Sequence, residues 1–220
     1  MRFNAFGQGD DEPGTVTRNY RVLLVSEVDR GSLAVALRGP YSALIELGGD
    51  DEPVGDWAAV AISGAGFYLS LTTATGFGLQ VAALVSDELV ARGVVTGEQR
   101  SVVELCLQEA VANAIVHGNL GIASTAKDYP EGYRVFSQLV NERLNDPVLR
   151  RRRTDIFTRW SSRLLDISVA DQGTGFDTSV IPTEVDGTSR SGRGFVFMRA
   201  LAGRVAVTDG GRCTSLRFML

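Results

Sequence analysis

The chain has 220 residues, of which 44% are hydrophobic, and a formal net charge of -4. This length allows one large domain or a domain with a small appendage, and the apolar content suffices for a buried core. The acidic balance argues against direct nucleic-acid binding, and no apolar run reaches the roughly 18 residues that suggest a membrane span. With no basic-then-apolar leader and two cysteines that lack metal-site spacing, the sequence favours a cytoplasmic protein.

The N-terminal region divides into a polar tail and a short alternation of strands and helix. Residues 1–19 are rich in Gly, Asp and Glu, which predicts a flexible tail. Residues 20–63 resemble the first half of a response-regulator receiver domain, although no phosphoacceptor aspartate follows the third strand. A small extension of the main sheet is the alternative interpretation. The predicted elements are strands at 21–25, 41–47 and 57–62 and a helix at 31–38.

Residues 64–220 mix helical and strand periodicities. The apolar recurrence over residues 79–90 predicts a helix. Thr96 or Ser101 is a candidate cap for the next helix, which is expected to stop at Gly118. Later elements are predicted as helices at 133–144 and 195–201, a strand at 67–71, and two hairpins made of 154–160 with 163–170 and of 205–208 with 214–219.

The first of three functional motifs lies near the end of the capped helix. Its sequence over residues 109–118 is EAVANAIVHG. Because residues four apart share a helical face, Glu109 and Asn113 project together, with His117 one turn further on. Asparagine offers a neutral oxygen ligand for Mg²⁺, and a glutamate accepts a proton from an attacking hydroxyl or water. A helix with a solvated polar stripe is the alternative.

The second motif, DQGTGF over residues 171–176, follows a half-buried strand. A carboxylate such as Asp171 accepts a hydrogen bond from the exocyclic amine of adenine. Gly173 and Gly175 allow a sharp turn and the close approach of a ligand. The same spacing also occurs in ordinary tight turns.

The third motif, GRGFVFM over residues 192–198, opens a helix. The unpaired N–H groups at such a start, near Gly192 and Gly194, form an anion site suited to phosphates, to which Arg193 adds charge. Phe195 is more typical of packing than of ligand contact. A lone Gly-x-Gly carries little weight without the other two motifs.

The order of the three motifs resembles the ATP-binding fold shared by histidine kinases, gyrase and mismatch-repair ATPases. The likeness is greatest to the small anti-sigma-factor serine kinases, whose asparagine box reads Glu-Ala-x-x-Asn-Ala-x-x-His-Gly, as residues 109–118 do. The resemblance covers about residues 64–220. It implies an α+β fold built as a two-layer α/β sandwich.

The resemblance also implies a role for each motif residue. Glu109 would be the general base, Asn113 would hold Mg²⁺ through the phosphates, and Asp171 would bind adenine. Residues 176–191 would form the ATP lid. Thr214 aligns only loosely with the family's last-strand threonine. The nucleotide-binding set so implied is Asn113, His117, Gly118, Asp171, Gly173, Gly175, Phe176, Gly192, Arg193, Gly194, Phe195 and Thr214.

Two features depart from the family pattern or stand outside it. Residues 119–153 form an insertion with a helix of its own, which would change the partner surface and leave the pocket motifs untouched. Arg150 to Arg153 form a basic run, which we interpret as a solvated entrance to a strand, with contact to RNA or an acidic protein as the alternative.

These observations favour a protein serine/threonine kinase that transfers the γ-phosphate of ATP to a partner. By resemblance, the substrate would be an anti-sigma-factor antagonist, the sequestered partner a sigma factor, and the kinase a possible homodimer. The only histidine lies in the asparagine box, so none is left as the phosphoacceptor of a histidine kinase. A catalytically silent ATP-binding module and an ATPase with water as acceptor remain the alternatives.

Overall fold

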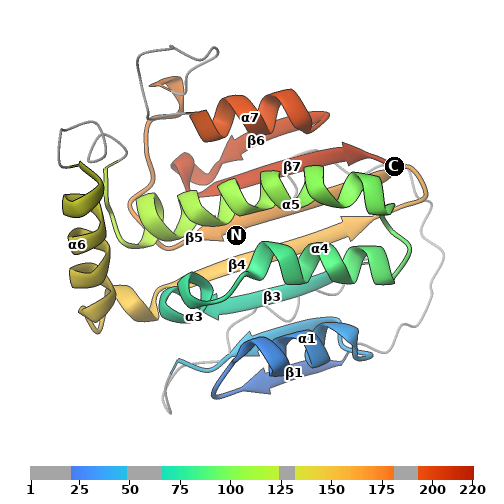
Figure 1. Ribbon diagram of the computed structural model, residues 1–220, viewed down its shortest axis with the longest axis horizontal. Coiled ribbons are helices and arrows are strands. Elements are labelled where there is room, and N and C mark those ends of the chain that lie inside the picture. Colours follow the sequence, from blue (N-terminus) through green and yellow to red (C-terminus); the bar gives the residue numbers. More distant parts are fainter. Residues whose placement is uncertain (1–20, 49–65, 124–131, 181–192) are drawn as a thin grey trace.

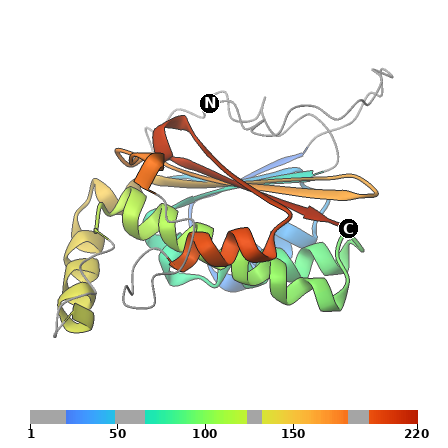
Figure 2. The same ribbon diagram turned by 90° about the horizontal axis from the view of Figure 1, so that it is seen from above.

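The fold is built around one mixed β-sheet. The computed structural model describes residues 21–48, 66–123, 132–180 and 193–220. Within these residues, seven strands pair in the order β1-β2-β3-β4-β5-β7-β6 (Figure 1). The helices α1, α3, α4, α5 and α7 all lie on one face of this sheet, so the architecture has two layers (Figure 2). The α+β fold class expected from the sequence is confirmed.

The first two strands extend the sheet on its β3 side. Strands β1 (Val22–Val25) and β2 (Ala43–Glu46) pair in parallel, and β2 pairs in parallel with β3 (Gly66–Thr72). Parallel neighbours need a crossover, and α1 (Arg30–Arg38) provides the one between β1 and β2. The Asp29 carboxylate caps this helix by accepting a hydrogen bond from the Ser32 N–H. The predicted tail 1–19 and the predicted strand 57–62 lie outside the described residues.

The next segment contains a short helix that periodicity did not predict. Helix α3 (Thr73–Gly78) is too short and too rich in glycine for a helical pattern. Its start is fixed instead by Thr72, whose hydroxyl accepts a hydrogen bond from the Thr75 N–H. The buried carboxylate of Glu46 strengthens this start by accepting from the Thr72 N–H and the Thr75 hydroxyl. Strand β2 therefore anchors α3 through Glu46.

Two long helices then cover the centre of the sheet. Helix α4 (Val81–Ala91) buries Val85 and Leu89 completely against this layer. Helix α5 (Gly97–Ala112) begins at Thr96, whose side chain forms a capping box with Gln99. Of the two candidate caps, Thr96 is therefore the one used.

The C-terminal half supplies antiparallel strands in the predicted hairpins. Strands β3, β4 and β5 pair antiparallel in turn, β5 pairs antiparallel with β7, and β7 with β6. Helix α6 stands beyond one end of the sheet (Figure 2). The bounds are α6 (Gly132–Asn145), β4 (Arg153–Trp160), β5 (Leu164–Asp171), α7 (Arg193–Leu201), β6 (Arg204–Thr208) and β7 (Cys213–Met219).

The hydrophobic core lies between the sheet and its helices. Central strands contribute Ile156, Ile167 and Leu216, each at most 1% exposed. A smaller cluster of Ile45 and Tyr68 gathers on strands β2 and β3 separately from this core. In the described part of the chain, every helix is too short or too polar to cross a lipid bilayer.

Candidate functional site

The first motif sits where α5 changes into a wider helix. Glu109 and Asn113 lie one α-helical turn apart, but Asn113 also begins a π-helical segment, η1 (Asn113–Asn119). In a π-helix the backbone bonds run from i to i+5, so residues four apart no longer stack directly. His117 is placed inside this wide segment, where its Nδ1 lies 2.5 Å from the carbonyl oxygen of Ile122. The helix ends at Asn119, one residue beyond the predicted stop at Gly118.

The start of α7 meets this end of α5. A Cβ atom on Gly194 would lie 2.5 Å from Oε2 of Glu109 and 3.8 Å from Nδ2 of Asn113. A side chain at position 194 would therefore require the Glu109 carboxylate to move. The Nδ2 of Asn113 is buried and has no hydrogen-bond partner among the described residues. A buried N–H group without a partner would be stabilised by a ligand that accepts its hydrogen bond.

The second motif is held against the first by glycine contacts. Asp171 ends β5, is 7% exposed, and accepts a 2.8 Å hydrogen bond at Oδ1 from the Gly173 N–H. A Cβ on Gly118 would overlap the Asp171 carboxylate, and a Cβ on Gly173 would overlap the Gly118 carbonyl. Residues 118, 171 and 173 thus touch, although they come from two distant parts of the chain.

The environment of Asp171 shifts its acidity. Burial raises the pKa of this carboxyl to about 6, against the opposing effects of the Gly173 N–H, Arg212 and Arg152, while Asp209 raises it further. The carboxylate is consequently ionised near neutral pH at a cost in desolvation. A buried carboxylate in such a state is suited to accept a hydrogen bond from a ligand.

The remainder of the second motif packs against the turn between β6 and β7. The Phe176 N–H donates to the Gly210 carbonyl at 3.0 Å, and Gly175 has a φ of +74°. The Phe176 and Phe195 rings lie 6.1 Å apart, so the first residue of the predicted lid lies beside the first turn of α7. Thr214 lies opposite Val169 on β7, which puts its side chain on the sheet face of Asp171.

Comparison with known proteins agrees with this arrangement. Residues 78–219 match the histidine kinase-like ATPase domain. The chain belongs to this family. Among curated protein sequences, none matches it. ATP binding follows from the family membership, because the match includes the three motifs that converge in the structure.

Part of the ATPase domain's predicted site lies outside the described residues. Gly192 and most of the predicted lid, residues 181–191, belong to this part. Arg193 is exposed at the first position of α7, next to Gly194. The structure therefore brings Glu109, Asn113 and Gly194 together at one point, and Gly118, Asp171 and Gly173 at another. Both points lie along η1 and the end of α5.

The arginine run leads into strand β4, but the interpretation that it is solvated is wrong for Arg153. Arg153 is 1% exposed, and its guanidinium donates to the hydroxyl and the carbonyl of Ser70. Arg152 is half-buried and donates from Nη1 to the carbonyl of Asn119 at 2.7 Å. Local charge density did not reveal this role, because both arginine partners come from distant segments of the sequence.

Sequence reasoning also missed Asn119, the last residue of η1. Its side chain is completely buried and bonds to strand β4 and to the residue after β5. The sequence signal that was available is its position directly after the asparagine box. Cys106 and Cys213 are buried free thiols, and no cluster of metal-ligating side chains occurs among the described residues.

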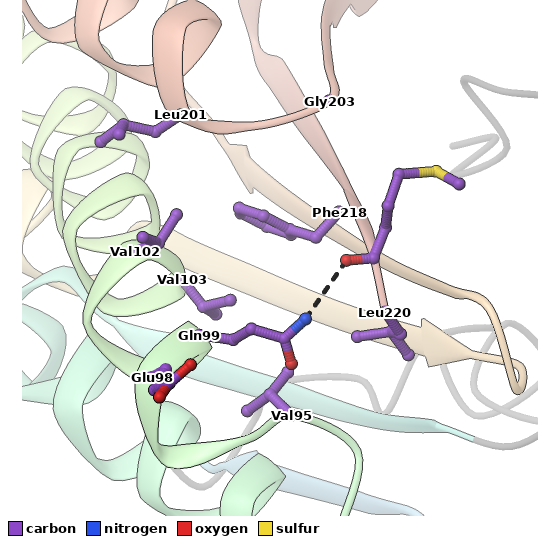
Figure 3. Close-up of a pocket in the computed structure, with 10 residues that line it drawn as sticks. Val95, Glu98, Gln99, Val102, Val103, Leu201, Gly203, Phe218 and Leu220 are labelled. Atoms are coloured by element: carbon purple, nitrogen blue, oxygen red, sulfur yellow. Dashed lines mark hydrogen bonds between the residues drawn. The ribbon is translucent and has the colours of Figure 1, made fainter.

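The ATPase domain also has an apolar groove at the opposite end of α5. This groove has a volume of about 450 Å³ and lies between the start of α5, the end of α7 and the end of β7 (Figure 3). The Gln99 Nε2 donates to the Met219 carbonyl at 3.4 Å across it. Its lining residues are Val95, Glu98, Gln99, Val102, Val103, Leu201, Gly203, Phe218, Met219 and Leu220. The groove contains none of the motif residues and is separate from the ATP site.

Proposed function

We propose that this ATPase domain is a protein serine/threonine kinase of the anti-sigma-factor type. The observation that carries the proposal is the contact between Gly194 and the side chains of Glu109 and Asn113. It brings a candidate base to the start of a nine-residue helix, α7, and the first-turn N–H groups at such a helix start suit phosphate. A base that lies beside a phosphate site is the arrangement that phosphoryl transfer to a hydroxyl requires.

Nucleotide orientation would come from the other contact point. In this proposal the Asp171 carboxylate accepts a hydrogen bond from the exocyclic amine of adenine. Gly118 and Gly173 leave room for that carboxylate, since a side chain on either would displace it or the backbone beside it. The triphosphate then extends along η1 toward Glu109 and Gly194, with Arg193 next to Gly194 at the start of α7.

The residues present also fit a magnesium ion bound through the phosphates. The Nδ2 atom of Asn113 is buried without a hydrogen-bond partner among the described residues, and both this atom and Oε2 of Glu109 lie close to Gly194. A half-turn of the amide exchanges nitrogen for oxygen, which is a ligand that Mg²⁺ prefers. Such an ion, held through Asn113, would supply neutralisation of the charge that develops on the phosphates during transfer.

In the reaction, Glu109 takes the proton from a serine hydroxyl of the partner protein. The serine oxygen forms a bond to the γ-phosphorus of ATP as the bond between that phosphorus and the β–γ bridging oxygen breaks. The products are a phosphoserine and ADP, and the proton stays on Glu109 until it passes to water. Positioning and charge neutralisation account for most of the rate in this class of reaction.

The partners we propose are an anti-sigma-factor antagonist as substrate and a sigma factor as the sequestered protein. Support comes from the asparagine box, which matches that of the anti-sigma-factor kinases at every fixed position. The single histidine of the chain lies within this box, which leaves none for autophosphorylation on histidine. Helix α6 adds a largely exposed polar face near the site that a homodimer or another partner would contact.

The test is incubation of the purified protein with γ-labelled ATP, Mg²⁺ and an antagonist-domain protein encoded beside it. Wild type should transfer the label to the antagonist, and Glu109→Gln should lose transfer while its ATP affinity changes little. Glu98→Gln is the matched control, because Glu98 is an exposed glutamate at the other end of the same helix. ATP binding without transfer would indicate a silent binding module, and phosphate release without any antagonist would indicate an ATPase.

A further inference from the structure

Asn119 ties three parts of the fold together at the edge of the ATP site. Its Nδ2 donates to the Arg153 carbonyl at 2.9 Å and to the Thr154 hydroxyl at 3.1 Å. Its Oδ1 accepts from the Gln172 N–H at 2.8 Å. The side chain is 0% exposed, so its amide makes these bonds in the protein interior, where an unpaired polar group is costly.

Neighbouring groups reinforce the same junction. Arg152 donates to the carbonyl of Asn119, and the Gln172 Oε1 accepts from the Arg153 N–H at 2.8 Å. Gln172 is thus held through its backbone by η1 and through its side chain by β4. Because Gln172 directly follows Asp171, this double attachment fixes the backbone on one side of the carboxylate. On the other side, the Asp171 N–H donates to the Arg212 carbonyl.

The position of Asp171 therefore depends on Asn119. Gly118, which precedes Asn119, is in contact with the Asp171 carboxylate, and Gly173 is in contact with Gly118. A shift of η1 relative to β5 would move the carboxylate or press on it. The side chain of Asn119 is the group that sets this separation, since it spans from the end of η1 to Gln172 and Thr154.

We propose that Asn119 is a positioning residue that determines base selectivity, by holding the Asp171 carboxylate where it accepts from the exocyclic amine of adenine. This inference rests on the assignment of Asp171 to adenine in the proposed function. Asn119 itself is 0% exposed, so it would act through Asp171 and not by touching the nucleotide. Its loss should relax the choice between adenine and a base that carries oxygen at the same position.

The experiment compares the affinity of the full chain for ATP and for inosine triphosphate, which has a carbonyl in place of the exocyclic amine. Wild type should prefer ATP. Asn119→Ala should reduce the ratio of the two affinities by roughly tenfold, the order expected when one hydrogen bond is misplaced. Thr154→Val removes one acceptor of the Asn119 amide and preserves shape, so it should reduce the ratio by a smaller factor.

A stability control separates positioning from general loosening. Val85→Ala opens a cavity at a fully buried site on α4, far from the junction, and should lower the melting temperature without changing the ratio. If Asn119→Ala lowers the melting temperature but keeps the wild-type ratio, Asn119 is only structural and the inference is overturned. If Asn119→Ala does not fold, the same comparison is made with Thr154→Val. A wild-type ratio of the two affinities in that variant then overturns the inference.

Failure of the underlying assignment gives a different result. A wild-type protein that binds both triphosphates equally well would refute the role of Asp171 in reading adenine, and with it the inference. A wild-type protein that prefers ATP while both variants keep the full preference would refute the inference alone.

Discussion

The two ends of helix α5 differ in what converges on them. At the C-terminal end, Glu109 and Asn113 face the start of α7, and the π-helical turn carries Gly118 against Asp171. At the N-terminal end, a capping box begins the helix beside an apolar groove of about 450 Å³. The first end is polar and tightly packed, whereas the second is apolar and roomy.

This difference shows why an open cavity alone does not locate the site. The groove offers volume, but its lining is mostly aliphatic and aromatic. The polar end offers a buried carboxylate, an amide nitrogen without a partner among the described residues, and glycines at which an added Cβ would overlap neighbouring atoms. A nucleotide needs directed hydrogen bonds and charge compensation, which only the polar end provides.

A glycine at each end allows the sharpest test of the comparison. Gly118→Ala places a Cβ against the Asp171 carboxylate and should weaken ATP binding about 100-fold or more, roughly 3 kcal/mol. Gly97→Ala puts a Cβ into open space at the start of α5, so it should leave affinity unchanged and add about 0.5 kcal/mol of stability. Isothermal titration calorimetry with ATP and thermal melting measure both. Equal affinities for the two variants would contradict the packing described for the polar end.

Asp171→Asn should separate binding from stability. Loss of the charged acceptor should weaken ATP binding by about 1–3 kcal/mol. The same change removes a buried charge and should stabilise the ligand-free protein by about 1–3 kcal/mol at neutral pH, because burial raises the pKa of this carboxyl to about 6. Denaturant unfolding without nucleotide and calorimetry with ATP check the two effects.

The pH dependence of this variant follows from the direction of the shift. With a native pKa of about 6 against 3.8 for the free group, the folded state binds more protons between these values. The contribution of Asp171 to stability therefore falls as pH rises through this window, and the advantage of Asp171→Asn should vanish near pH 4. When the pH is lowered below about 6, the ATP affinity of wild type should decrease more than that of the variant. The titration of ATP itself affects both proteins equally, so the difference between them reports on Asp171. Parallel pH profiles for the two proteins would contradict the shift.

The smallest effect is expected at the N-terminal end of α5. Gln99→Ala removes one half of the capping box and the hydrogen bond to the Met219 carbonyl. We expect a loss of about 0.5–1 kcal/mol in the free energy of unfolding and no change in ATP affinity. A clear loss of ATP affinity would show that the two ends of the helix are coupled.

Local signals in the sequence predicted much of this molecule correctly. Thr96, one of two candidate caps, signalled the start of α5, and the turn at residues 209–211 signalled the last hairpin. Both are determined by residues within a few positions of each other. The three motifs were likewise visible as short strings, and their order predicted the family to which the chain belongs.

Other features depended on partners far away in the chain. Helix α3 starts at Thr72 with the help of Glu46, and Arg153 is buried because Ser70 accepts its hydrogen bonds. Neither pairing leaves a periodic trace in the sequence. The π-helical turn was also missed, because an asparagine box read at α-helical spacing continues as an ordinary helix.

By itself, the sequence determined the α+β class, the strand and helix order over most of the described chain, and the identity of the motif residues. These follow from apolar periodicity, caps and turns, which act over short distances along the backbone. Only the tertiary structure decided that Gly194 meets Glu109, that Gly118 meets Asp171, and that Asn119 bonds to Gln172, the residue after Asp171. Such contacts arise from the packing of η1 and α7 beside the sheet, and no local pattern encodes the distance between them.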